Sequence, residues 1–176
     1  MKDSRISMPS VLFICTANRF RSPLAEVMFR SALQDSRSDE SWVVDSAGTW
    51  TSPGLPVLPT VAVIARQYDL DLARHRSKEV TGGMLAKFDL ILVMESGHKE
   101  ALLHEFAGQA KYIHLLSQVA EGRAYDIPDA IQSVESMMAV GRDLYELIHK
   151  GLDNICNKAI QLQSDRGKPA QRTGTN

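Results

Sequence analysis

The chain has 176 residues, of which 44% are hydrophobic, and its 20 basic and 21 acidic side chains leave a net charge of −1. This length and composition predict one globular domain, and the balanced charge argues against nucleic acid or a membrane surface as a partner. No apolar run approaches the roughly 18 residues of a membrane span. The two cysteines, Cys15 and Cys156, are too few for a disulfide framework and lack the spacing of metal ligands.

Four short apolar runs are typical of strands buried on both faces, and segments with helical periodicity alternate with them. The strands are predicted at residues 11–14, 42–44, 88–94 and 112–116. The helices are predicted from Pro23 to Leu33, over 57–68, as a short helix or turn over 85–88, over about 97–106 and over about 134–162. Ser22 followed by Pro23 is a helix-start signature. Cys156 lies on the apolar stripe of the last helix, so we assign it to the core.

The alternation of strands and helices predicts an α/β domain in which helices cover a parallel sheet. Such sheets bind ligands at the carboxyl ends of their strands. Residues 1–9 are expected to be a disordered N-terminal extension, and residues 164–176 a disordered, basic C-terminal tail. Residues 117–133 are predicted to form a long loop, and loops of this length within a compact domain are often functional.

Cys15 begins a Cys-x5-Arg-Ser sequence between the first predicted strand and the first predicted helix. Backbone N–H groups of such a loop can turn inward around an anion, and the helix N-terminus adds positive potential. Arg21 supplies a planar fork for two phosphate oxygens, and the same field favours a thiolate, to which Ser22 can donate a hydrogen bond. A thiolate inside an anion-binding loop is an activated nucleophile for phosphoryl transfer. The predicted phosphate-binding residues are Thr16, Ala17, Asn18, Arg19, Phe20, Arg21 and Ser22.

The segment from Val11 to Glu26 resembles the signature of the low-molecular-weight protein tyrosine phosphatases. Matching segments follow in the same order at residues 45–49, 75–78, 88–94 and 126–129, so the resemblance covers roughly residues 10–160. It implies a cytoplasmic phosphatase without metal or cofactor. It also implies a four-stranded parallel sheet, doubly wound with helices on both faces. Residues 10–163 are accordingly expected to form a single phosphatase domain.

Expulsion of an oxygen leaving group from phosphorus needs a proton donor from another segment of the chain. Asp129 matches the family's acidic residue, although Ala130 stands where the family has proline, and Asp126 is the alternative donor. The resemblance implies a reaction in two steps. Cys15 attacks phosphorus while Arg21 and the loop amides hold the oxygens, and Asp129 then activates the water that hydrolyses the phosphocysteine.

The resemblance also assigns supporting residues. Asn18, Ser46 and His75 are expected to form a hydrogen-bond network that stiffens the loop, and Asn18 tolerates the left-handed backbone that a tightly wound loop requires. Trp50 and Tyr125 are candidate walls of the substrate pocket, because an aromatic ring there can stack on a phosphoaryl group.

The expected substrate is a phosphotyrosine-containing protein or a small phosphomonoester, and the expected assembly is a monomer or weak dimer. Arg19, also at the pocket wall, would add positive charge at the rim and favour substrates with extra negative charge. Three alternatives remain. One is a phosphatase for another phosphorylated residue, such as phosphoarginine. A thiol-dependent arsenate reductase needs two further cysteines, and only Cys156 remains. A non-catalytic phosphate-binding module is disfavoured because the nucleophile, the arginine and the acid are all present.

Overall fold

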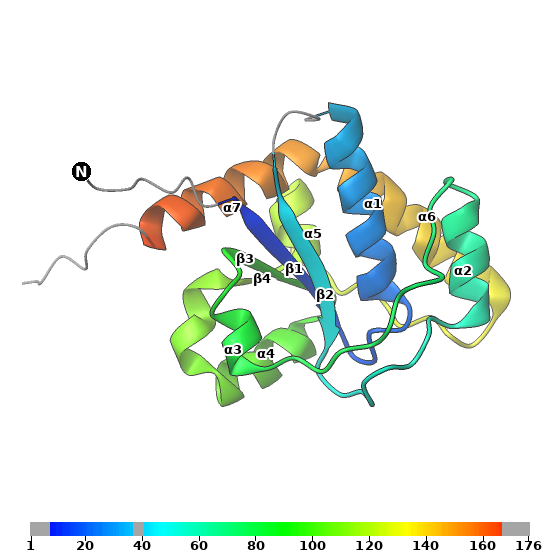
Figure 1. The fold of residues 1–176 in the computed structure, drawn as a ribbon, viewed down its shortest axis with the longest axis horizontal. Coiled ribbons are helices and arrows are strands. Elements are labelled where there is room, and N and C mark those ends of the chain that lie inside the picture. The colour runs from blue at the N-terminus through cyan, green and yellow to red at the C-terminus, as the bar shows by residue number, and fades with distance from the viewer. Residues whose placement is uncertain (1–7, 37–40, 167–176) are drawn as a thin grey trace, which may run out of the picture.

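The computed structural model describes residues 8–36 and 41–166 (Figure 1). Residues 1–7 of the predicted extension and residues 167–176 of the predicted tail lie outside the described residues. The elements in chain order are β1 (Ser10–Cys15), α1 (Arg21–Ser36), β2 (Val43–Gly48), α2 (Pro59–Arg66), α3 (Gly82–Leu85), β3 (Leu90–Val93), α4 (Ser96–Glu105), the 3-10 helix η1 (Ala107–Tyr112), β4 (Ile113–Leu115), α5 (Leu116–Glu121), α6 (Val134–Lys150) and α7 (Leu152–Arg166). Within the described part of the chain, no helix is long and apolar enough to cross a membrane.

The strands form one parallel sheet in the order β2-β1-β3-β4, which confirms the predicted α/β fold. β1 is an interior strand that pairs with β2 on one side and with β3 on the other. Successive residues of a strand point to opposite faces, and helices cover both faces here. Every residue of β1 and β3 is therefore buried, as their continuous apolar sequences require.

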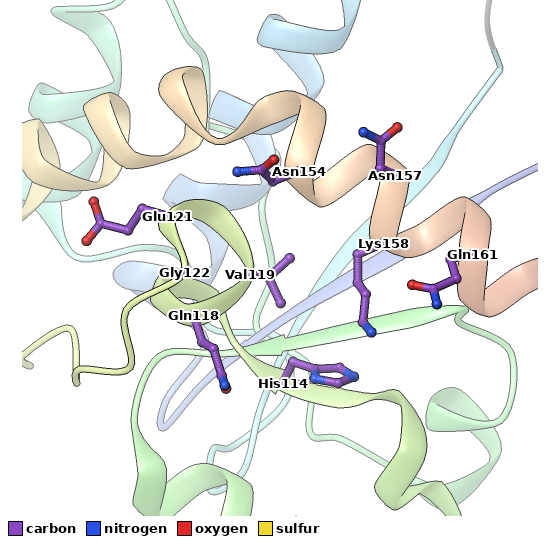
Figure 2. A pocket seen from close by; sticks show the side chains of 9 residues that line it. All are labelled: His114, Gln118, Val119, Glu121, Gly122, Asn154, Asn157, Lys158 and Gln161. Carbon is purple, nitrogen blue, oxygen red and sulfur yellow. The ribbon is translucent and has the colours of Figure 1, made fainter.

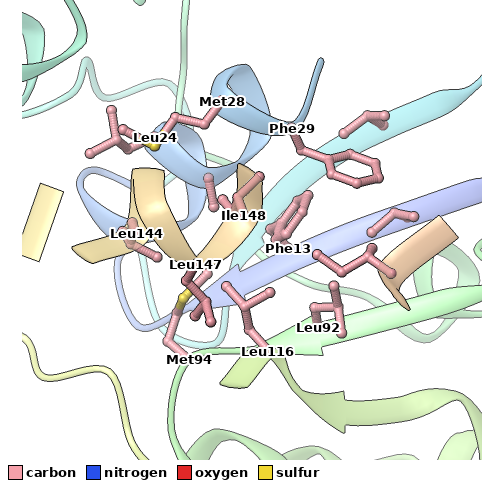
Figure 3. Close-up of a cluster of buried hydrophobic side chains, with 14 of the residues drawn as sticks. Phe13, Leu24, Met28, Phe29, Leu92, Met94, Leu116, Leu144, Leu147 and Ile148 are labelled. Carbon is pink, nitrogen blue, oxygen red and sulfur yellow. The ribbon is translucent and has the colours of Figure 1, made fainter. Parts of the chain in front are cut away.

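Different helices cover the two faces of the sheet (Figure 1). On one face, Phe13 of β1 packs with Phe29 of α1 and Ile148 of α6 (Figure 3). The two phenylalanine rings meet edge to face, with centroids 5.6 Å apart. On the opposite face, Leu12 of β1 packs in a second cluster that includes Leu102 of α4. This packing on both sides is the doubly wound arrangement that the resemblance implied.

The segment between β4 and the end of the chain differs from the prediction. Residues 117–133 are not one loop, because α5 occupies their first part. The single long helix predicted after them is wrong, because it is divided into α6 and α7 at Gly151. A Cβ at Gly151 would lie only 2.5 Å from the Cβ of Ala120, so α5 packs against the point of division. α7 continues to Arg166, into the first residues of the predicted tail.

The carboxyl ends of the strands meet at the lower edge of the sheet in Figure 1. β1 ends at Cys15 and β2 ends at Gly48, and the two residues are paired. Met94 follows β3, and its carbonyl accepts a hydrogen bond from the N–H of Ile127 at 2.8 Å. This bond holds the segment between α5 and α6 close to the end of β3.

Asp89, just before β3, ties the start of the sheet to the end of α7. Its carboxylate accepts hydrogen bonds from the N–H of Ser10 at 3.0 Å and from its hydroxyl at 2.8 Å. Asp89 also lies 3.9 Å from Nε of Arg166, whose guanidinium carbon is 3.7 Å from the centroid of the Tyr112 ring. The first strand and the last helix are thus joined at the amino edge of the sheet.

Candidate active site

The residues between β1 and α1 form a loop at the carboxyl edge of the sheet, called the catalytic loop below. Cys15 ends β1 and is 2% exposed. The carbonyls of Cys15 and Thr16 accept hydrogen bonds from the N–H groups of Thr49 at 2.9 Å and Trp50 at 3.0 Å. Gly48 permits this approach, because a Cβ there would lie 2.5 Å from the carbonyl oxygen of Thr16. Backbone contacts therefore hold the catalytic loop against the end of β2.

The thiol of Cys15 lies at the base of the catalytic loop, 3.0 Å from Oγ of Ser22. Oγ of Ser22 accepts a hydrogen bond from Nδ2 of Asn18 at 2.9 Å, so its own proton is available for donation. The sulfur is closer to this hydroxyl than the alternative acceptor, the carbonyl of Ala47 at 3.3 Å. The base of the loop thus combines a hydroxyl donor at the sulfur with the start of α1 at Arg21.

Asn18 lies at the centre of a hydrogen-bond network behind the loop. It is fully buried and has a φ of 53°, the left-handed conformation that we predicted it to tolerate. Its Nδ2 also donates to Oγ of Ser46 at 2.9 Å, and its Oδ1 accepts from the N–H of Lys78 at 2.9 Å. Its carbonyl oxygen accepts from Nε2 of His75 at 2.8 Å. The structure thus brings Asn18, Ser46 and His75 together.

Glu26 extends this network, and the sequence analysis missed it. Its carboxylate accepts the hydroxyl proton of Ser46 at 2.6 Å and forms an ion pair with Arg30 at 2.9 Å. Because Ser46 gives its proton to Glu26, its oxygen is left to accept from Asn18, which fixes the direction of each hydrogen bond. The available signal was an acidic residue one turn after Ser22, between the apolar residues Ala25 and Met28 of the predicted helix.

Arg21 is only 1% exposed, although it is charged. Its Nη1 donates to the carbonyl of Ile127 at 2.7 Å and forms an ion pair with the carboxylate of Glu95. Its Nε is buried, lies 3.4 Å from Oδ1 of Asp129 and has no hydrogen-bond partner among the described residues. A buried donor without a partner costs free energy, and an oxyanion held in the loop would supply the acceptor.

The two candidate proton donors have different surroundings. The side chain of Asp129 is 43% exposed and lies beside the guanidinium of Arg21. The carboxylate of Asp126 accepts hydrogen bonds from the N–H of Ser96 at 2.7 Å and from its hydroxyl at 3.0 Å. Asp126 therefore holds the segment to the start of α4, whereas Asp129 is the candidate donor that lies at Arg21.

Four residues of the predicted binding loop and pocket wall have different surroundings. Arg19 donates from Nε to the carbonyl of Pro56 at 2.7 Å, which holds its charge at the edge of the loop. Phe20 is 3% exposed and packs in the core, so only its backbone can face an anion. Ala17 is exposed, and the left-handed residue of the loop is its neighbour Asn18. Trp50 is 80% exposed, and its backbone bond keeps it next to the loop.

Tyr125, the other candidate wall residue, is oriented toward α5. The guanidinium carbon of Arg123 lies 5.9 Å from its ring centroid. Burial, and next the hydrogen bond to the carboxylate of Glu121, raise the pKa of its hydroxyl. The backbone of Tyr125 is tied to the hydroxyl of Ser117 by hydrogen bonds of 3.1 Å and 2.7 Å. Because its backbone is bonded to Ser117 of α5, the ring of Tyr125 lies with Glu121 and Arg123.

Glu95 and His98, at the start of α4, also belong to the site and were missed from the sequence. Nε2 of His98 is 2.9 Å from Oγ1 of Thr16, and its Nδ1 accepts the N–H of Glu95 at 3.1 Å. Burial, and next the charge of Arg21, lower the pKa of His98, so its ring is neutral at pH 7. The available signal was an acidic residue directly after the third predicted strand, at the edge where such sheets bind ligands.

A hollow of about 690 Å³ lies apart from the catalytic loop, between β4, α5 and α7 (Figure 2). Its lining includes His114 on β4, Gln118 on α5 and Lys158 on α7, and none of its lining residues belongs to the catalytic loop. Within residues 8–36 and 41–166, no group of three or more His, Cys, Asp or Glu side chains is arranged to hold a metal ion.

Comparison with known proteins gives consistent matches. The sequence model of the low molecular weight phosphotyrosine protein phosphatases matches residues 10–166. The chain is 28% identical over 160 residues to the low molecular weight protein-tyrosine-phosphatase Wzb of Salmonella typhi, covering 90% of this chain and 97% of that protein. It is also 28% identical over 156 residues to the protein-arginine-phosphatase of Bacillus subtilis, covering 89% and 98%. The crystal structure of the low molecular weight protein tyrosine phosphatase from T. tengcongensis matches with a TM-score of 0.76 and 29% identity, covering 84% of this chain and 99% of that one.

Proposed function

The chain belongs to the low molecular weight phosphotyrosine protein phosphatase family, and we propose that it hydrolyses phosphotyrosine monoesters through Cys15. One observation carries the proposal. The Cys15 sulfur lies 3.0 Å from the hydroxyl of Ser22, at the base of a loop that continues into the buried guanidinium of Arg21. A polarised thiol and a buried cation on one loop fit an anionic substrate that is attacked by sulfur.

In the first step, the thiolate of Cys15 attacks phosphorus, and the bond from phosphorus to the leaving oxygen breaks. Nε of Arg21, which is buried without a hydrogen-bond partner among the described residues, would donate to one phosphoryl oxygen together with N–H groups of the loop. Asp129 would give its proton to the leaving oxygen. The position of Asp129 beside Arg21, and the engagement of Asp126 by Ser96, support Asp129 as this acid.

In the second step, water attacks the phosphocysteine and the bond between sulfur and phosphorus breaks. The carboxylate of Asp129, now without its proton, accepts a proton from that water, and inorganic phosphate leaves. The network of Asn18, Ser46 and His75 supports this cycle by keeping the loop in one conformation, so that little reorganisation is needed as charge develops.

The substrates in this proposal are phosphorylated proteins and small phosphomonoesters. A reactive thiol persists in a reducing compartment, which supports a cytoplasmic location together with the family resemblance. The exposed ring of Trp50 beside the loop supports its role as a pocket wall that stacks on the phosphoaryl group.

The alternatives fit the residues less well. The Bacillus subtilis relative is named a protein-arginine-phosphatase. In this chain, however, the positive charge of Arg19 at the rim would repel the guanidinium leaving group of a phosphoarginine substrate. A disulfide-shuttling arsenate reductase needs accessible cysteines near Cys15, and Cys156 is fully buried on α7. A non-catalytic binding module would not need both the nucleophile and Asp129.

The test is steady-state hydrolysis of aryl and alkyl phosphates by the wild type and three variants. Cys15→Ser should abolish turnover, and activity that survives this change would refute the proposal. Asp129→Asn should lower kcat by about 100-fold or more, with the larger loss on the alkyl phosphate, whose leaving group needs the proton more. Asp126→Asn is the matched control for charge and should cost less; if it is the slower of the two, the acid is wrongly assigned.

A further inference from the structure

His98 contacts both halves of the phosphate-binding machinery. The N–H of Glu95 donates to Nδ1 of His98 at 3.1 Å, so this nitrogen carries no proton. The proton of the neutral ring is therefore on Nε2, which donates it to Oγ1 of Thr16 at 2.9 Å. Thr16 follows the nucleophile directly. One buried imidazole thus joins the start of α4 to the first residue of the catalytic loop.

The same histidine also fixes the carboxylate that holds Arg21. Glu95 and His98 form a capping box at the start of α4, in which the Glu95 carboxylate accepts from the N–H of His98 while the ring accepts from the N–H of Glu95. The other contact of that carboxylate is the ion pair with Arg21. The position of the arginine therefore depends on His98 through Glu95, and the position of Thr16 depends on it through a direct hydrogen bond.

We propose that His98 is a positioning residue of this phosphatase, which sets the distance between the sulfur end and the arginine end of the phosphate site. The inference rests on the proposed function for its kinetic readout, but its effect on phosphate binding is independent of turnover. If hydrogen bonds within the catalytic loop were its only constraint, the loop could still shift relative to α4. His98 removes this freedom because its two ring nitrogens face the two elements.

The charged groups that face the ring fix its protonation as well. Burial, and next the charge of Arg21 from α1, lower the pKa of His98, and the charges of Glu95, Asp129 and Asp126 oppose this change. A second proton on Nδ1 would meet the N–H of Glu95, so protonation of His98 breaks the capping box. As the pH falls, the Glu95 carboxylate is therefore no longer held in place to pair with Arg21.

Four variants separate the two contacts. His98→Asn places an oxygen near Nδ1, which keeps the bond from Glu95, but the side chain is too short to reach Thr16. His98→Gln places an amide nitrogen near Nε2 and keeps the bond to Thr16. His98→Ala removes both contacts, and Thr16→Val removes only the acceptor hydroxyl. His114→Ala is the matched control, because it removes a half-buried histidine that lies on β4 in the separate hollow and whose pKa burial also lowers.

The measurements are kcat and KM for an aryl phosphate and the Kd of inorganic phosphate by calorimetry. We expect His98→Ala to lower kcat/KM by about 100-fold, the effect of a misplacement of roughly 1 Å in an active site, and to weaken phosphate binding by about 10-fold. His98→Asn and His98→Gln should each recover part of both losses. The double variant of Thr16→Val and His98→Ala should be no worse than His98→Ala alone, because the two single changes remove the same bond.

The acid limb of the pH profile gives a second readout that a merely structural histidine would not change. Below pH 6.5, kcat/KM of the wild type should fall as His98 is protonated, and His98→Asn should lose this component of the profile. Equal phosphate Kd in the wild type and His98→Ala would overturn the inference even if the chain were inactive. Losses that match those of His114→Ala would overturn it as well. Inactivity of the wild type combined with weaker phosphate binding by His98→Ala would refute the proposed function alone.

Discussion

Replacement of Gly48 by alanine should displace the catalytic loop without removing any side chain from it. The added Cβ would lie 2.5 Å from the carbonyl oxygen of Thr16 and 3.1 Å from backbone atoms of Ala17 and Asn18, whereas ordinary contacts begin at 3.4 Å. The carbonyl of Thr16 must therefore move by about 0.9 Å. It cannot move alone, because the N–H of Trp50 is bonded to it at 3.0 Å.

The size of the effect follows from this displacement. A misplacement of about 1 Å in an active site costs roughly 100-fold in rate, so kcat/KM for an aryl phosphate should fall by about that factor. Overpacking typically costs about 1–3 kcal/mol, which corresponds to a decrease in Tm of roughly 2–12 °C for a domain of this size. The variant should therefore remain folded at 25 °C while most of its activity is lost.

Steady-state hydrolysis at 25 °C and thermal unfolding followed by circular dichroism test this prediction. The matched control is Gly83→Ala in α3, because a Cβ there would meet no atom of the described residues within 4 Å, apart from its chain neighbours and the backbone of its own helix. The control should retain full activity and be at least as stable as the wild type. If Gly48→Ala keeps kcat/KM within about threefold of the wild type, the catalytic loop does not need its close contact with β2.

Three further changes address other parts of the site. Glu95→Gln removes the charge that pairs with Arg21 and should lower kcat/KM for an aryl phosphate by about 10-fold, while Glu100→Gln on the exposed side of α4 should leave it unchanged. Arg19→Glu should raise KM more for phosphotyrosine peptides with acidic neighbours than for neutral ones; equal changes would contradict a role at the rim. Because the folded state lowers the pKa of His98 below 6.5, the free energy of unfolding should decrease as the pH falls below that value. Urea titrations should show a flatter pH dependence for His98→Asn, and an unchanged slope would show that His98 is not protonated differently on unfolding.

The central part of the fold could be predicted because its signals are local. The run that ends at Cys15 is continuously apolar, as a strand covered on both faces must be, and the helix-start signature at Ser22 follows within one loop. The position of the nucleophile at this junction needs no knowledge of distant contacts. The second strand was predicted too short because Asp45 and Ser46 are polar, yet they lie in β2 and bond to Lys78 and Asn18.

The features that were missed depend on contacts between segments far apart in the chain. The last helix is divided at Gly151, where Ala120 of α5 comes so close that a Cβ would clash, and this approach involves residues 31 positions apart in the chain. Glu95 and His98 reach the catalytic loop because β1 and β3 are neighbours in the sheet, an order that periodicity alone does not reveal. The expectation that Tyr125 lines the pocket relied on its place beside the predicted acid loop, and the contacts of its side chain with Glu121 and Arg123 could not be inferred from that place.

The contact of Asp89 with both Ser10 and Arg166 has a practical consequence for protein engineering. It places the two ends of the described fold side by side at the amino edge of the sheet, opposite the edge that carries Cys15 (Figure 1). A tag or a second domain joined directly after Arg166 would therefore begin at the edge of the sheet opposite the catalytic loop. New termini opened at an exposed turn, with the old ones joined by a short linker, would preserve the same sheet in a circular permutant.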